Sequence, residues 1–221
     1  MKGKLIVFEG TDGSGKATQT QLLCEHLDRL GIDFRKIDFP RYDKPSAAMV
    51  KEYLDGNLGK KPEDVNAYAA SMFYAMDRYA SYKQDWGQFY EQGGLIVADR
   101  YTTSNAVHQA SKLPDGERED YLKWLFHTEY GLLELPEPDL VIYLDMPTEI
   151  TERMMRQREK LTGTHADIHE QDEEYLKQCR LNARKVVDTC KWSIIHCAEG
   201  DFPKTPKAIH DEVYELVKAY L

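Results

Sequence analysis

The sequence predicts an α/β fold in which a five-stranded parallel sheet carries helices on both of its faces. Short β-rich runs alternate with helical stretches along the whole chain, an order that is typical of parallel sheets. Each run has four to six residues and is bounded by glycine, proline or charged residues, as expected for buried parallel strands. A glycine-rich loop between the first run and the first helical stretch agrees with this architecture.

The individual elements follow from hydrophobic spacing and from residues that end helices. The strands are expected at Leu5–Glu9, Phe34–Phe39, Leu95–Ala98, Leu140–Leu144 and Ser193–Cys197. After the first strand, Leu22, Leu23, Leu27 and Leu30 form an apolar stripe with helical spacing, and Gly31 ends that helix. Further helices are expected at Val65–Glu91 (one or two helices), Glu117–Leu132, Thr148–Arg158, Glu173–Cys190 and Pro206–Tyr220.

One segment interrupts this regular pattern. Glu159–Gln171 is polar, contains a glycine and has no hydrophobic period, so we expect a mobile loop there. No internal repeat, low-complexity tract or long Pro/Gly/Ser-rich linker marks a second domain. The chain is therefore expected to form one domain over residues 1–221, with a lid at about 156–171.

Composition and charge restrict the functional class. Hydrophobic residues make up 42% and charged residues 30% of the chain, which suits a globular protein with one sizeable core. The net charge of −9 argues against a nucleic-acid polymer or an anionic membrane as a partner, and no apolar run is long enough to cross a bilayer. Four cysteines without a CxxC pair, and only four apolar residues before Glu9, lead us to expect reduced thiols in a cytoplasmic protein.

The motif with the clearest chemistry is the loop from Gly10 to Lys16, which matches GxxxxGK. It follows a predicted strand and opens a predicted helix, the context in which this motif binds nucleotide phosphates. Its glycines let backbone N–H groups point at phosphate oxygens, and Lys16 supplies a positive charge. Ala17 departs from the pattern, because the usual Ser or Thr would offer Mg²⁺ an oxygen. The residues expected to hold the nucleotide are Gly10, Thr11, Asp12, Gly13, Ser14, Gly15, Lys16, Ala17 and Thr18.

Four motifs together resemble those of thymidylate kinases. They are Glu9–Gln19, Phe39-Pro40-Arg41 after the second strand, Tyr74-x-x-x-Arg78 on the intervening helix and Asp99-Arg100-Tyr101 after the third strand. The resemblance extends from Lys4 to about Asp172 and implies a P-loop NTPase fold with a mobile lid. It also implies ATP-dependent phosphorylation of dTMP to dTDP in dTTP synthesis, Mg²⁺ as cofactor and a homodimer.

The same resemblance implies catalytic and metal-binding roles. Catalysis is assigned to Lys16, Asp99, Arg100, Arg156 and Arg158. The two lid arginines would supply a cation that some relatives carry inside the P-loop, where this chain has Gly13. Mg²⁺ would be held by Asp99 and Asp12, directly or through water.

The acceptor dTMP is expected to contact aromatic, cationic and amide side chains. Phe39 and Tyr74 would pack on the thymine ring, and Arg78 and Arg100 would hold the acceptor phosphate and the transferred group. The full set is Asp12, Phe39, Arg41, Tyr74, Arg78, Arg100, Asn105, His108, Gln109 and Glu170. Arg41 follows a strand at the edge where open α/β sheets bind ligands, with a structural salt bridge as the alternative explanation.

Three alternatives to this function stay open. A deoxynucleoside kinase would need a general base after the second strand, where Asp38 is the only nearby acid and Arg41 suits a monophosphate. Other nucleoside monophosphate kinases share the loop but lack the combination of the other motifs. A nucleotide-binding pseudo-kinase is compatible with Ala17, although Lys16 and Asp99 are retained.

Overall fold

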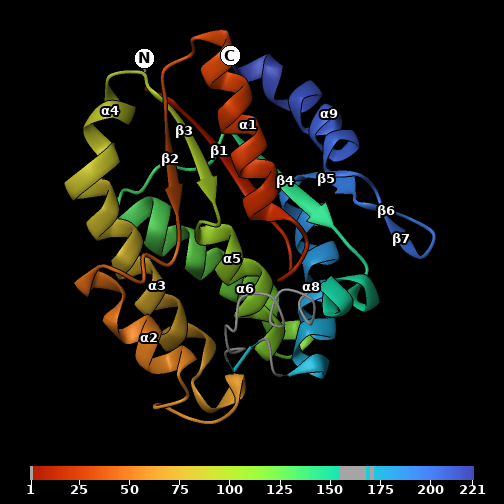
Figure 1. Cartoon of the computed structure of the whole chain (residues 1–221). Coiled ribbons are helices and arrows are strands. Elements are labelled where there is room, and N and C mark those ends of the chain that lie inside the picture. Colours follow the sequence, from red (N-terminus) through yellow and green to blue (C-terminus); the bar gives the residue numbers. More distant parts are fainter. Residues whose placement is uncertain (1, 155–167, 170–171) are drawn as a thin grey trace.

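The computed structural model describes residues 2–154, 168–169 and 172–221 and contains a five-stranded sheet, which can be followed in Figure 1. The strands are β1 (Lys4–Glu9), β2 (Phe34–Asp38), β3 (Leu95–Asp99), β4 (Leu140–Asp145) and β5 (Ser193–His196). They lie in the order β2-β3-β1-β4-β5, and every neighbouring pair is parallel. The predicted α/β class and the five strands are confirmed, with ends that differ by one residue from the predicted ones.

Helices connect the strands. They are α1 (Lys16–Leu30), α2 (Ala48–Leu54), α3 (Ala67–Ser81), α4 (Gly87–Glu91), α5 (Thr102–His108), α6 (Asp115–Phe126), α8 (Glu173–Cys190) and α9 (Pro206–Val217), with a further helical stretch at 148–154. π-Helical turns at Tyr82–Trp86 and His127–Leu132 follow α3 and α6. A short antiparallel hairpin pairs β6 (Ala198–Glu199) with β7 (Phe202–Pro203). Within the part of the chain that the structure describes, none of these helices combines the length and apolarity needed to cross a membrane.

The sequence did not predict α2 or α5. α5 reads Thr-Thr-Ser-Asn-Ala-Val-His, and most of these residues lose rotamer freedom in a helix or compete for backbone hydrogen bonds. Six of its seven residues are nevertheless buried, and the helix packs against α3, α6 and α8. Tertiary packing therefore keeps α5 helical although its residues have a low helix propensity.

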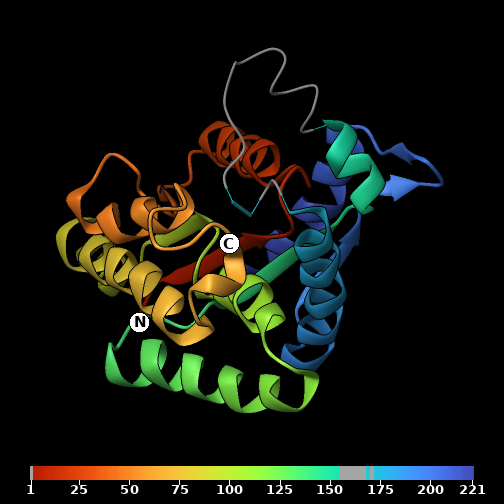
Figure 2. The same cartoon turned by 90° about the horizontal axis from the view of Figure 1, so that it is seen from below.

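The two faces of the sheet carry separate hydrophobic cores. Because successive residues of a strand point to opposite faces, Ile6 of β1 packs with Leu27 of α1 and Val213 of α9. Its neighbour Val7 packs with Trp86 and the aromatic residues of the other face. Figure 2 shows the sheet between α1 on one side and the α3–α6 helices on the other. The prediction that helices cover both faces of the sheet is confirmed.

The carboxyl ends of β1, β2 and β3 meet at one edge of the sheet. Asp99 at the end of β3 is in register with Phe8 of β1 and with Asp38 of β2. The glycine-rich loop after β1, Phe39-Pro40-Arg41 after β2 and Arg100-Tyr101 after β3 therefore start side by side. This is the edge at which open α/β sheets bind ligands.

Candidate active site

The loop between β1 and α1 has the backbone shape of a phosphate cradle. Gly10 and Gly15 have positive φ angles of 155° and 95°, which strain any residue with a side chain. A Cβ atom on Gly10 would also lie 2.9 Å from the Leu144 carbonyl oxygen. The buried Lys16 Nζ donates hydrogen bonds of 2.9 Å to the carbonyl oxygens of Gly10 and Thr11. Lys16 is thereby held at the amino terminus of α1, where phosphate oxygens are favoured.

Two cavities lie at this edge of the sheet. The loop cavity is lined by Asp12, Gly13, Gly15, Lys16, Ala17, Thr18, Asp38, Phe39, Pro40, Tyr42, Asp99, Arg100 and Met154. The inner cavity is lined by Asp12, Phe39, Pro40, Tyr42, Leu54, Tyr74, Arg78, Arg100, Tyr101, Ser104, Asn105, His108, Gln109 and His169. Five residues belong to both linings, namely Asp12, Phe39, Pro40, Tyr42 and Arg100. The two cavities therefore adjoin at these residues.

The inner cavity brings together eight of the ten residues predicted to bind the acceptor. They come from the P-loop, the end of β2, α3, the start of the segment after β3, and α5 with the residue that follows it. The two exceptions are Arg41, which does not line the cavity, and Glu170, which lies outside the described residues. The predicted lid arginines Arg156 and Arg158 also lie outside the described residues.

Arg100 stands where the two cavities adjoin. Its φ of 69° is in the left-handed region, which is uncommon for a residue other than glycine and frequent at functional sites. Its guanidinium pairs with the Asp12 carboxylate and donates to Ser104 Oγ at 3.2 Å and His108 Nε2 at 3.3 Å. Burial alone would raise the pKa of Asp12, but the charges of Arg100 and Lys16 hold that pKa well below its ordinary value. Asp12 is therefore an ionised partner that orients Arg100.

Glu9, for which no role was predicted, supports the same region beside the P-loop. Its buried carboxylate accepts hydrogen bonds from the Gly10 backbone N–H at 2.9 Å, Thr103 Oγ1 at 2.9 Å and Ser104 Oγ at 2.7 Å. It also lies 3.6 Å from the Arg100 guanidinium. Glu9 thus ties the P-loop to the first turn of α5. Its place at the end of a strand was visible in the sequence, but its partners were not.

Two histidines form part of the wall of the inner cavity. Burial, with a smaller contribution from the charge of Arg100, lowers the pKa of His108 to about 3, so its ring is neutral at physiological pH. Its ring lies parallel to that of His169, with centroids 6.2 Å apart. His169 Nε2 is 2.7 Å from the hydroxyl of Tyr53 in α2, and the neighbouring Ile168 N–H donates to the Leu54 carbonyl oxygen at 3.3 Å. Residues 168–169, which fall within the predicted lid, therefore contact α2, and His169 was not predicted as a site residue.

Arg41 is hydrogen-bonded to a buried aspartate and does not line the inner cavity. Its backbone N–H and Nε donate to the Asp77 carboxylate at 2.8 and 3.1 Å, and its Nη2 donates to Ser46 Oγ at 2.9 Å. Ser46 Oγ in turn donates to Asp77 at 2.6 Å. The side chains of Arg41 and Asp77 are 12% and 1% exposed. This is the structural salt bridge that the sequence left open for Arg41.

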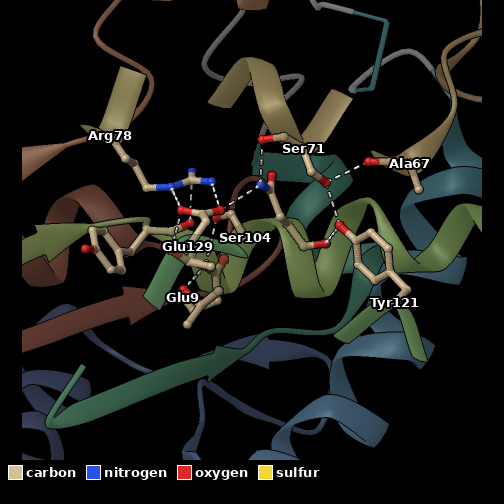
Figure 3. A network of polar contacts seen from close by, with 11 residues as sticks. Glu9, Ala67, Ser71, Arg78, Ser104, Tyr121 and Glu129 are labelled. Carbon is tan, nitrogen blue, oxygen red and sulfur yellow. Dashed lines mark hydrogen bonds and ion pairs between the residues drawn. The ribbon is translucent and has the colours of Figure 1, made fainter. Parts of the chain in front are cut away.

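Arg78 and Glu129 form an ion pair in the interior (Figure 3). Arg78 Nε and Nη2 donate to the two oxygens of Glu129 at 2.6 and 2.5 Å, and both side chains are 1% exposed. Burial alone would lower the pKa of Arg78, but the Glu129 carboxylate raises it. The charge of Arg78 is therefore balanced within the protein by Glu129.

Asp99 and Asp38 offer oxygen ligands to a metal ion in the loop cavity. They are opposite each other in the register of β2 and β3, and burial, together with the charges of Asp99 and Asp43, raises the pKa of Asp38. Within the described residues, no hydrogen bond or ion pair engages the Asp99 carboxylate, and no group of three or more His, Cys, Asp or Glu could hold a metal. Two carboxylates beside a phosphate loop fit Mg²⁺, because phosphate and water oxygens can complete its shell. Asp12 fits less well, since Arg100 already pairs with it.

Comparisons with known proteins agree with this geometry. The family model for thymidylate kinase matches residues 8–204. The thymidylate kinase of Mycobacterium tuberculosis is 30% identical over 174 residues, 77% of this chain and 79% of the relative. That of Afipia carboxidovorans is 33% identical over 222 residues, 98% of this chain and 90% of the relative. A solved structure of thymidylate kinase from Candida albicans has a TM-score of 0.73 at 21% identity, covers 99% of this chain and 92% of that chain, and supports the shared fold.

Proposed function

The chain belongs to the thymidylate kinase family, and from this premise we propose that it transfers the γ-phosphoryl group of ATP to dTMP and forms dTDP. The observation that best supports the proposal is that the loop cavity and the inner cavity adjoin at Arg100. Phosphoryl transfer requires little covalent work from a protein but needs donor and acceptor in line and their charge stabilised. Two adjoining cavities with a guanidinium between them supply that arrangement.

The loop cavity is the site for the ATP phosphates. Backbone N–H groups of the P-loop and the amino terminus of α1 favour phosphate oxygens, and Lys16 can leave its two carbonyl partners for the β- and γ-phosphates. Asp99 and Asp38 would hold Mg²⁺ in this cavity, and Mg²⁺ when bound neutralises charge on the phosphates. Ala17 contributes no oxygen, so the carboxylates carry more of the metal binding than in a P-loop with Ser or Thr at that position.

The inner cavity is the site for dTMP. Arg100 is held in place by Asp12, Ser104 and His108, so it can contact the acceptor phosphate and the transferred group without a large rearrangement. Phe39 and Tyr74 offer aromatic surfaces for the thymine ring. These assignments follow the roles that the family resemblance implies.

Arg78 receives a different role from the one expected. Because Glu129 balances its charge, Arg78 is better suited to a neutral hydrogen-bond acceptor of the base than to a phosphate dianion. Arg41 acts on the cavity indirectly, by holding the segment that carries Phe39 and Tyr42. The catalytic role of Arg156 and Arg158, the contact of Glu170 with the thymidine end, a homodimer and a cytoplasmic location stay predictions from the resemblance.

A deoxynucleoside kinase is less compatible with the site. Its general base would have to lie beside the 5′-hydroxyl of the acceptor. Asp38, the acid closest to the end of β2, lines the loop cavity and is absent from the lining of the inner cavity. The acid that does line the inner cavity, Asp12, is paired with Arg100 and is less suited to act as that base.

The test is an ADP-release assay with ATP across dTMP, dUMP, dCMP, UMP, AMP, GMP and thymidine. We expect dTMP to be the best acceptor, dUMP to be weaker by about 10-fold or more, and thymidine to be inert. The weaker reaction of dUMP reflects the lost thymine methyl group, worth about 1–3 kcal/mol in a shaped apolar pocket. Preferred turnover of thymidine, AMP or dCMP would contradict the proposal, and ATP binding without any turnover would indicate a pseudo-kinase.

A further inference from the structure

Glu129 accepts hydrogen bonds from residues of two helices (Figure 3). Two N–H groups come from Arg78 of α3, and one hydroxyl comes from Thr102 of α5 at 2.7 Å. The Asn105 side-chain amide, also on α5, lies 3.5 Å from Glu129 Oε1 and donates to the Ser71 carbonyl oxygen at 3.2 Å. Arg78 and Asn105 line the inner cavity, whereas Glu129 does not. Glu129 therefore contacts cavity residues without facing the cavity itself.

Glu129 lies where the helix changes from α to π geometry. α6 passes into the π-helical turn His127–Leu132, in which the Leu133 N–H donates to the Thr128 carbonyl oxygen at 2.9 Å. A π turn contains more residues than an α turn, so it rotates the side chains within it relative to those of the preceding helix. Glu129 lies inside this turn and is fully buried. Such turns are rare and often occur at functional sites.

The ion pair fixes which edge of Arg78 is available. An arginine has five N–H donors, and three of them are engaged by Glu129 and, at 3.4 Å, by the Tyr101 carbonyl oxygen. Among the described residues, no partner engages the other two N–H groups, one on Nη1 and one on Nη2. Since Arg78 lines the inner cavity, a ligand there can accept hydrogen bonds from these two groups. A planar, two-point contact fixes the orientation of the guanidinium more strongly than a single hydrogen bond.

We propose that Glu129 is a positioning residue for acceptor selectivity, which holds Arg78 so that its two remaining N–H groups donate to a carbonyl oxygen of the base. The inference rests on the proposed function. A pyrimidine with a carbonyl at position 4, as in dTMP, matches these donors, whereas dCMP presents an amino group at that position. Glu129 touches neither substrate and acts through Arg78.

The first test replaces Glu129 by glutamine, which keeps the size of the side chain but removes its charge. The KM for dTMP should rise about 10- to 100-fold, the effect of losing a well-placed charged hydrogen bond. The kcat and the KM for ATP should change by less than about 3-fold, because the P-loop is untouched. The preference for dTMP over dCMP in kcat/KM should fall by about 10-fold or more. Glu119→Gln is the matched control, since that side chain is 76% exposed on α6, and it should leave every parameter unchanged.

A double-mutant cycle with Arg78→Met separates positioning from general structural support. If Glu129 acts through Arg78, the double variant should have the same KM for dTMP as Arg78→Met alone. Fold-changes that multiply would show that Glu129 acts independently of Arg78 and would overturn the inference. A wild-type KM for dTMP in Glu129→Gln would overturn it as well.

If Glu129→Gln does not fold, Thr102→Val tests the positioning role of Glu129 instead. This variant removes one donor to Glu129 without creating a buried charge, and it should raise the KM for dTMP about 3- to 10-fold at constant kcat. An unchanged KM would overturn the inference. A wild-type enzyme that uses another acceptor instead of dTMP would overturn the proposed function and this inference with it. Normal dTMP turnover with an unaffected Glu129→Gln would overturn the inference alone.

Discussion

Replacing Asp77 by asparagine tests whether its ion pair with Arg41 fixes residues 39–42, which line the inner cavity except at Arg41. The Asp77 carboxylate accepts hydrogen bonds from the Arg41 N–H, Arg41 Nε and Ser46 Oγ at 2.8, 3.1 and 2.6 Å. An asparagine has one acceptor oxygen and one donor amide in place of the two carboxylate oxygens. At least one of these donors would then face another donor, and the Arg41 charge would lose its counter-ion. We therefore expect a loss of both stability and acceptor binding.

The magnitude follows from the burial of the two side chains. Breaking a fully buried ion pair by removing one partner costs about 3–5 kcal/mol. Asp77 is 1% exposed but Arg41 is 12% exposed, and Arg41 keeps its hydrogen bonds to Ser46 Oγ and to the Asp77 carbonyl oxygen. Partial solvation and these remaining bonds reduce our expectation to about 2–3 kcal/mol. For a domain of this length, that corresponds to a fall in Tm of about 4–12 °C.

Thermal unfolding at pH 7 and steady-state kinetics measure the two effects. Asp77→Asn should lower Tm by the stated amount and raise the KM for dTMP several-fold, because Phe39 and Tyr42 line the inner cavity on either side of Arg41. Asp43→Asn is the control, since that side chain is 73% exposed and pairs only with Lys44 among the described residues; it should change Tm by less than about 1 °C. A stable Asp77→Asn together with a large loss of activity in Arg41→Met would refute the reasoning and favour direct substrate contact by Arg41.

Two further predictions concern the reaction itself. Asp99→Asn should raise the Mg²⁺ concentration for half-maximal dTMP phosphorylation by about 10-fold or more, whereas Ala17→Ser should lower it only modestly; a magnesium titration measures both, and little effect from Asp99→Asn would show that the metal was assigned to the wrong carboxylate. Of Arg156→Ala and Arg158→Ala, at least one should lower kcat by about 10²-fold with a smaller change in the KM for dTMP; near-normal kcat in both variants would contradict a catalytic lid.

The strands and the phosphate loop were predictable because their signals are local. A short aliphatic run such as Leu5–Glu9, followed by GxxxxGK and an apolar helical stripe, determines strand, loop and helix within about thirty residues. Parallel strands bring their carboxyl ends to one edge, so the motifs after β2 and β3 were expected to converge there. Eight predicted acceptor residues do line one cavity. The π-helical turn at His127–Leu132 lies within a range that the sequence predicted as ordinary helix, since its residues have no distinctive spacing.

The partners of the cationic residues could not be predicted in the same way. Glu129 is separated from Arg78 by 51 positions, and Asp77 from Arg41 by 36. A single acidic residue in a helical stretch is most often solvated, so its burial depends on the packing of α3 against the end of β2 and against α5. The consequence was largest for Arg78. Its place in the inner cavity was predicted, but the carboxylate that balances its charge was not.

α3 connects these two ion pairs, because Asp77 and Arg78 are consecutive residues of that helix. Side chains of consecutive helical residues point about 100° apart, so one turn reaches the Arg41 segment on one side and Glu129 on the other. Buried ion pairs are weak contributors to stability, since well-packed apolar residues often replace them at little cost. An apolar pair at these positions could therefore still pack α3 into the fold. It could not fix the orientation of a guanidinium or the backbone of the segment that carries Phe39 and Tyr42. The geometry of the inner cavity, more than the stability of the domain, therefore depends on these two opposite charges at adjacent positions of one buried helix.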